Sequence, residues 1–180
     1  MARAPVRALV LTVSDSRSRG ERRDLSGPAV ARMLKDSGFE VAEPLLVADD
    51  QPAIKAALVE RSAEFPLIVT TGGTGIAPRD VTPEATRAVC ERVLDGFGER
   101  MRSAGREQTS LASLSRAVAG TRGRTLIVNL PGSPQGAVAS LAAVLDLIPH
   151  ALSLLSGAEA HLEHATGSDT TGTGEDPTRP

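Results

Sequence analysis

Two short runs of apolar, largely β-branched residues limit what this chain can fold into more than any other feature. The runs are Leu67–Thr71 (LIVTT) and Thr125–Leu130 (TLIVNL), and neither shows the polar–apolar alternation of a half-exposed strand. Strands of this kind are typical of a parallel sheet that helices cover on both faces. Residues 6–13 and 41–47 form two further apolar runs and are predicted to add strands to the same sheet.

Helical patterns separate these runs. Ser26 is a predicted N-cap, and Val30, Met33 and Leu34 follow it at helical spacing until Gly38 ends the segment. Further helices are expected to begin at Asp50, at Thr82 with Pro83, and over residues 96–104. The longest apolar stripe covers residues 138–155, and Pro149 is expected to kink or split that helix.

Strand and helix therefore alternate along the chain. This order predicts the α/β class, as a three-layer αβα sandwich with a mostly parallel central sheet. A length of 180 residues corresponds to about one domain. We expect a short lead over residues 1–5, a single domain over 6–164, and a disordered tail over 165–180, where no apolar side chain exceeds alanine in size.

Composition excludes several classes of function. The net charge of −2 and the three aromatic residues, all Phe, argue against a basic nucleic-acid-binding face or a base-stacking platform. The single cysteine excludes a disulfide framework and a multi-cysteine metal cluster within one chain. No apolar run is long enough to span a membrane, and the N-terminus lacks the features of a signal peptide, so we expect a cytoplasmic protein.

Each predicted strand ends in a polar or glycine-rich turn. Ligands of open α/β sheets bind beyond the carboxyl ends of the strands, and in a parallel sheet these ends meet at one edge. The four turns are residues 14–16, 49–50, 72–75 with 78–80, and 131–134.

The turn Gly72-Gly73-Thr74-Gly75 carries the strongest local pattern. Glycines leave backbone N–H groups open to a ligand, and successive N–H groups in a tight turn bind anions, so one interpretation is a phosphate site. The other is a strand-to-helix turn that only requires positive φ. The loop matches neither the P-loop pattern nor the dinucleotide fingerprint, because Pro78 occupies the place of the third glycine after Gly73 and Gly75.

Two aspartates, Asp49 and Asp80, lie close to this loop in the predicted arrangement. Asp49 or Asp50 could simply cap a helix, and Asp80 could cap a turn. Beside a bound phosphate, however, a carboxylate at about 4 Å costs on the order of 4 kcal/mol at an effective dielectric near 20. Carboxylates at a phosphate site therefore imply a cation between the charges, and Mg²⁺, held by Asp49 and Asp80, is the expected ion.

The remaining candidates are weaker. Cys90 is expected to pack in a helix, and His150 has no evident partner. Arg17, Arg19, Arg22 and Arg23 are interpreted as a solvated charge run, with binding of a substrate phosphate as the alternative. His161 and His164 are interpreted as surface residues, with metal binding from a shared helix face as the alternative.

Six blocks of sequence occur in a characteristic order, and together they resemble one known family. The blocks are VSDSRSRG with DLSGP, VADDQ, TTGGTG, PRDVTPEAT, LSR and NLPGSP. They are similar to the molybdopterin adenylyltransferase (Mog/MoaB) family of molybdenum-cofactor biosynthesis over about residues 6–156. The resemblance implies a three-layer α/β protein that assembles as a homotrimer or hexamer. It also implies Mg²⁺-dependent transfer of AMP from ATP to the terminal phosphate of molybdopterin, which releases pyrophosphate and supplies a separate molybdate-inserting protein.

The resemblance also implies roles for individual residues. The required aspartates match Asp49 and Asp80, which are the expected catalytic and metal-binding residues. The nucleotide- and molybdopterin-binding positions match Ser14, Asp15, Gly72, Gly73, Thr74, Gly75, Ser115, Pro131, Gly132 and Pro134. Ser133 is counted with these binding residues because it lies within the 131–134 turn, although the family varies at its position.

Three other interpretations stay open at this point. The chain could be a non-catalytic molybdopterin-binding paralogue, because motifs alone do not prove turnover. It could be a trimeric scaffold of the same fold, or an unrelated nucleotide-binding α/β enzyme.

Overall fold

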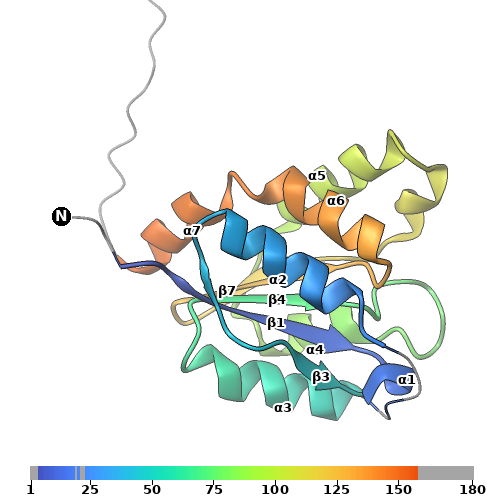
Figure 1. Ribbon diagram of the computed structural model, residues 1–180, viewed down its shortest axis with the longest axis horizontal. Helices are drawn as coiled ribbons and strands as arrows, with labels where there is room; N and C mark the ends of the chain where they lie inside the picture. The colour runs from blue at the N-terminus through green and yellow to red at the C-terminus, as the bar shows by residue number, and fades with distance from the viewer. Residues whose placement is uncertain (1–3, 19, 21–22, 158–180) are drawn as a thin grey trace, which may run out of the picture.

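A seven-stranded sheet lies between two layers of helices (Figure 1). The computed structural model describes residues 4–18, 20 and 23–157. The strands are β1 (Arg7–Val13), β2 (Glu40–Val41), β3 (Leu45–Val47), β4 (Leu67–Thr71), β5 (Arg92–Val93), β6 (Ala119–Arg122) and β7 (Thr125–Leu130). The helices are α1 (Asp15–Ser18), α2 (Ser26–Asp36), α3 (Gln51–Ser62), α4 (Thr82–Val89), α5 (Asp95–Arg106), the 3₁₀ helix η1 (Ser110–Leu114), α6 (Pro134–Val144) and α7 (Ile148–Leu155).

The sheet is mostly parallel, as predicted. Its order is β2-β1-β4-β7-β6-β5, and β3 also pairs with β1. The pairs among β1, β2, β3, β4 and β7 are parallel, whereas β5 and β6 form an antiparallel edge beside β7. The carboxyl ends of β1, β3, β4 and β7 therefore lie along the same edge.

The central strands are buried on both faces. In β1, Ala8 and Val10 face one core, while Leu9, Leu11 and Val13 face the other. Helices α2, α5, α6 and α7 cover the first core, and helices α3 and α4 cover the second (Figure 1). This double burial explains the continuous apolar runs of β4 and β7 and confirms the three-layer architecture.

Two features of the sheet differ from the prediction. Residues 41–47 form two short strands, β2 and β3, instead of one. Pro44 interrupts them, because proline cannot donate a hydrogen bond to the ladder. Strands β5 and β6 were not predicted. Both are short, and Gly120 inside β6 weakens the apolar pattern from which a strand is recognised.

The predicted helices are present, but one cap is different. Ser26 is not the N-cap of α2; it is a buried helical residue. The carboxylate of Asp24 instead accepts hydrogen bonds from the backbone N–H groups of Ser26 and Gly27, both at 3.1 Å. Asp50 caps α3 as expected, and accepts a hydrogen bond from Ala53 N at 2.9 Å.

The later helices follow the predicted pattern. Helix α4 begins at Thr82, and α5 extends the expected segment 96–104 by one residue at its start and two at its end. The long apolar stripe is split as predicted: α6 ends before α7 begins at Ile148, and Pro149 lies in the first turn of α7. Among the described residues no single helix has the length and hydropathy of a membrane span. Helices α6 and α7 meet these criteria only as a pair bent by 63°.

The predicted domain limits extend beyond the described part of the chain. Residues 158–164 of the expected domain and the whole of the expected tail, 165–180, lie outside the described residues. The division into lead, domain and tail therefore stays a prediction.

Candidate functional site

The four turns at the carboxyl edge of the sheet are joined by hydrogen bonds. Asp15 N donates to Asp49 Oδ2 at 3.0 Å, and Asp49 N donates to Asp15 Oδ1 at 2.9 Å, which links the turns after β1 and β3. Gly72 N donates to Leu130 O at 3.1 Å, which links the ends of β4 and β7. The predicted convergence of the four turns is confirmed.

Conformation and close approach both require glycine in the loop after β4. Gly72 has φ +105°, and a Cβ atom there would lie 2.2 Å from Val13 O. Gly73 has φ +63°, and its Cβ would lie 2.3 Å from the Thr82 hydroxyl oxygen. A Cβ on Gly75 would lie 2.7 Å from Asp80 Oδ2. The first two glycines thus provide a turn with positive φ, and the loop backbone approaches its neighbours more closely than any side chain would allow.

Two carboxylates flank this glycine loop. Asp49 Oδ1 lies 3.4 Å from the position that a Cβ of Gly73 would take. Asp80 lies beside Gly75, and its Oδ2 accepts a hydrogen bond from Ala77 N at 2.8 Å. Asp80 therefore does cap a turn, as the simpler interpretation expected, and it also borders the loop.

Like charges accumulate at Asp49. Burial raises the pKa of this carboxyl above its usual value, and the nearby carboxylates of Asp15 and Asp80 raise it further. The hydrogen bond from Asp15 N and the charge of Arg79 act in the opposite direction. Within the described residues, no three His, Cys, Asp or Glu side chains are arranged to hold a metal ion by themselves.

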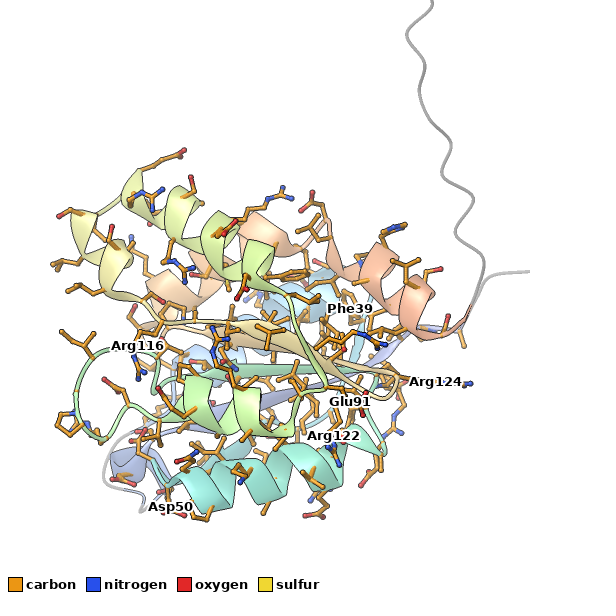
Figure 2. All side chains as sticks on the ribbon, turned by 180° about the vertical axis from the view of Figure 1, so that it is seen from behind. Phe39, Asp50, Glu91, Arg116, Arg122 and Arg124 are labelled. Carbon is orange, nitrogen blue, oxygen red and sulfur yellow. The ribbon has the colours of Figure 1, made fainter. Side chains whose placement is uncertain are left out.

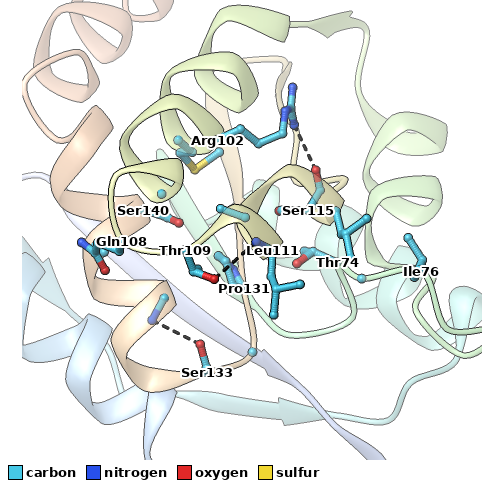
Figure 3. Close-up of a pocket in the computed structure, with 18 of the residues that line it drawn as sticks. Thr74, Ile76, Arg102, Gln108, Thr109, Leu111, Ser115, Pro131, Ser133 and Ser140 are labelled. Carbon is cyan, nitrogen blue, oxygen red and sulfur yellow. Dashed lines mark hydrogen bonds between the residues drawn. The ribbon is translucent and has the colours of Figure 1, made fainter.

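A cavity of about 500 Å³ opens beside the glycine loop (Figure 3). Gly73, Thr74 and Gly75 form one wall, and Pro131, Gly132 and Ser133 form a second. Residues of α5, η1, α6 and the segments next to η1 close the remaining sides, among them Met101, Gln108, Leu111, Leu114, Ser115 and Ser140. The cavity combines exposed backbone, hydroxyl groups and apolar surface, which is the usual lining of a small-molecule site.

Sequence comparison places this fold and site in a known family. The family model described as "Probable molybdopterin binding domain" matches residues 9–150. The chain belongs to this family. A molybdopterin adenylyltransferase of Helicobacter pylori is 43% identical over 155 residues, which cover 82% of this chain and 86% of that protein.

Solved structures agree with this assignment. The molybdopterin biosynthesis enzyme MoaB of Thermus thermophilus is 52% identical, covers 84% of this chain and 97% of its own, and superposes with a TM-score of 0.79. The molybdopterin biosynthesis Mog protein of Mycobacterium ulcerans is 40% identical, covers 83% of this chain and 99% of its own, and has a TM-score of 0.78.

The residues that family resemblance singled out occupy two adjoining regions. Those lining the cavity are Gly73, Thr74, Gly75, Asp80, Ser115, Pro131, Gly132 and Ser133. Ser14, Asp15, Asp49, Gly72 and Pro134 are not among the lining residues. Of these, Asp15 and Asp49 form the carboxylate pair described above, which adjoins the cavity at Gly73. The roles of all these residues stay predictions.

Two serines of the family motifs have defined local partners. Ser133 Oγ accepts a hydrogen bond from Gly136 N at 3.2 Å and is the N-cap of α6. Ser115 Oγ accepts from Ala117 N at 3.3 Å, and its carbonyl accepts from Arg102 Nη1 at 3.3 Å. Ser133 therefore contributes a cap, and Ser115 lies on the cavity wall opposite α6 (Figure 3).

The cavity wall that α5 and η1 form could not be inferred from the sequence motifs. Ile76, Leu111 and Leu114 are exposed apolar residues at the cavity, and the buried Met101 also lines it. Helical periodicity predicted α5, but it could not show that α5 and η1 would fold over the turn after β4. Arg116 contacts that turn but was not among the predicted site residues, because only Ser115 of the LSR motif was assigned a role.

The weaker candidates remain weak in the structure. Burial raises the pKa of the Cys90 thiol to about 11, so it stays protonated at neutral pH and is a poor nucleophile. His150 and Arg23 are exposed. The other predicted polar clusters, Arg19, Arg22, His161 and His164, lie outside the described residues, and the side chain of Arg17 is likewise not described.

Proposed function

We propose that this protein is a molybdopterin adenylyltransferase, which transfers AMP from ATP to the terminal phosphate of molybdopterin and releases pyrophosphate. One observation supports the proposal above all others: the backbone of the glycine loop borders a cavity of about 500 Å³, and carboxylates flank that loop on both sides. Relatives named molybdopterin adenylyltransferase supply the identities of the two substrates.

The chemistry requires alignment more than proton transfer. A phosphate monoester is already ionised at neutral pH, so its oxygen can attack the α-phosphorus of ATP in line without a general base. The leaving pyrophosphate takes the electrons of the broken P–O bond. On this proposal the N–H groups of residues 73–75 orient phosphate oxygens, and the start of α6 adds a partial positive charge. Ser14, Ser115 and the 131–134 turn complete the binding surface.

We propose Mg²⁺ as the cofactor, held by Asp49 and Asp80. The donors fit a hard cation, because both side chains offer carboxylate oxygens next to the glycine loop. Burial raises the pKa of Asp49 most, the carboxylates of Asp15 and Asp80 raise it further, and a cation would relieve the repulsion from those carboxylates. When bound, Mg²⁺ would supply neutralisation of phosphate charge. Two carboxylates with phosphate oxygens satisfy such an ion, so a third protein ligand is not needed.

We further propose a cytoplasmic homotrimer or hexamer that delivers adenylyl-molybdopterin to a molybdate-inserting protein. Family resemblance carries this part of the proposal. Leu25 and Leu46 are 56% and 43% exposed, and assembly would bury apolar side chains of this kind. Light scattering during size-exclusion chromatography tests the assembly, and a monomer mass would contradict it.

The direct test is turnover by the purified protein. With ATP and molybdopterin, pyrophosphate should be released and adenylyl-molybdopterin should be detected by mass spectrometry. Addition of EDTA should stop the reaction, and excess Mg²⁺ should restore it. Binding of molybdopterin without pyrophosphate release would identify a non-catalytic paralogue instead. Unchanged turnover in EDTA would contradict the role of the metal.

A further inference from the structure

The loop between Gly75 and Asp80 has little packing of its own. Residues 76–79 are all exposed, and Ile76 is 68% exposed. Hydrogen bonds therefore decide its conformation. Within the loop, Ala77 N donates to Asp80 Oδ2 and Asp80 N donates to Ala77 O, both at 2.8 Å. Thr82 N donates to Gly73 O at 3.1 Å and closes the base of the loop.

Arg116 joins both ends of this loop. Its Nε donates to Gly75 O at 2.7 Å, and its Nη2 donates to Asp80 O at 2.5 Å. Its backbone N donates to Thr74 O at 2.9 Å. A guanidinium presents its N–H groups in a rigid planar fork, so these bonds fix the two carbonyls relative to one another.

The third nitrogen of the guanidinium faces α4. Nη1 of Arg116 forms an ion pair with the carboxylate of Glu84. The two side chains are 37% and 44% exposed, and an ion pair this open to solvent adds little to stability. The two carbonyl contacts, rather than the ion pair, distinguish Arg116 from an ordinary surface arginine.

We propose that Arg116 is a positioning residue for adenylyl transfer, which holds the glycine loop and Asp80 in their reactive arrangement. This inference rests on the proposed function. Ser115 precedes Arg116 and lines the cavity, so one short segment sets the relative positions of Ser115, Gly75 and Asp80. Arg116 contacts main-chain atoms and Glu84, and it acts on the reaction through the loop.

Arg122 provides a matched control. Its Nη1 also donates to a main-chain carbonyl, Val89 O, at 3.0 Å. It lies toward the opposite end of the molecule from Arg116 (Figure 2) and does not line the cavity. Arg122→Ala therefore removes the same kind of bond without touching the site.

Four variants test the proposal in steady-state assays with ATP and molybdopterin. Arg116→Ala should lower kcat by about 100-fold, the size of effect expected when reacting groups are misplaced by about 1 Å, with a smaller change in KM. Arg116→Lys should recover part of the loss, because an ammonium can bond one carbonyl but cannot reproduce the fork. Guanidinium at non-denaturing concentrations should partly restore Arg116→Ala but not Asp80→Ala. Arg122→Ala should retain wild-type kcat.

Amide hydrogen exchange tests the bracing without turnover. In Arg116→Ala the amides of Ala77 and Asp80 should exchange faster than in the wild type, whereas Arg122→Ala should leave them unchanged. Equal exchange in all three proteins, or a kcat of Arg116→Ala equal to that of Arg122→Ala, would overturn the proposal. An inactive wild type with faster exchange in Arg116→Ala would refute the proposed function and retain the bracing. In that case Arg116 would have no role in adenylyl transfer, because the protein would not catalyse it.

Discussion

A Gly73→Ala variant places a methyl group at a confined point of the glycine loop, against the side chain of Thr82. The φ of +63° costs a non-glycine residue about 1–2 kcal/mol. The new Cβ would lie 2.3 Å from the hydroxyl oxygen of the fully buried Thr82, and overpacking of this kind costs about 1–3 kcal/mol. We therefore expect the free energy of unfolding to fall by about 2–5 kcal/mol.

Gly123→Ala separates the two contributions. Gly123 has φ +53° in the turn between β6 and β7, and no atom lies within 4 Å of an added Cβ. Only the backbone term applies there, so the loss should be about 1 kcal/mol, reduced by the lower entropy of the unfolded chain. Gly123→Ala should also keep full pyrophosphate release, whereas Gly73→Ala should lose it.

A double variant tests the contact itself. Thr82→Ala removes the hydroxyl and leaves the Thr82 Cβ at 3.4 Å from the added methyl group, so Gly73→Ala should be less destabilising in that background by about 1–3 kcal/mol. Urea denaturation followed by far-UV circular dichroism measures the wild type and the four variants, because the chain contains no Trp or Tyr for fluorescence. Equal losses in Gly73→Ala and Gly123→Ala, or no coupling to Thr82, would refute the reasoning.

Three further predictions concern the aspartates. Asp49→Asn should raise the free energy of unfolding at pH 7. The pKa of Asp49 is higher in the folded state, so its ionised carboxylate opposes folding at pH values above that pKa. Urea midpoints measured at falling pH should show that the gain in stability of Asp49→Asn over the wild type shrinks. Asp50→Ala should lower stability by about 0.5–2 kcal/mol through loss of the α3 cap while kcat stays at the wild-type value, and a large loss of kcat would contradict its assignment as a cap only. Asp80→Ala should lower kcat by about 100-fold or more with an unchanged circular dichroism spectrum, and full turnover would remove Asp80 from the mechanism.

The local sequence pattern predicted the strands and helices whose residues are buried in the hydrophobic core. Strands β4 and β7 were predicted with correct bounds, because they are buried on both faces and therefore read as short runs of mainly apolar residues. Strand β6 was missed because its pairing with β5 and β7 stabilises it, and its own sequence, AGTR, carries no strand pattern. The interruption of residues 41–47 by Pro44 was not predicted, although the proline is present in the sequence.

Parts of the candidate site could likewise be predicted from the sequence, whereas other parts could not. The turns at the sheet edge could be predicted from the topology rule, because each directly follows a strand. Contacts between residues far apart in the chain could not be predicted. The side chain of Arg116 reaches carbonyls 36 and 41 residues away. Such bonds depend on how α5 and η1 fold back over the sheet, which motif spacing does not encode.

The central claim is that the glycine loop binds nucleotide phosphates with help from the flanking carboxylates. A crystal structure of the protein with Mg²⁺ and a non-hydrolysable ATP analogue tests it most directly. We expect phosphate oxygens within hydrogen-bond distance of the N–H groups of Gly73, Thr74 and Gly75, with a cation between those oxygens and the carboxylates of Asp49 and Asp80. Nucleotide bound elsewhere, or bound there with both carboxylates turned away from the phosphates, would contradict it.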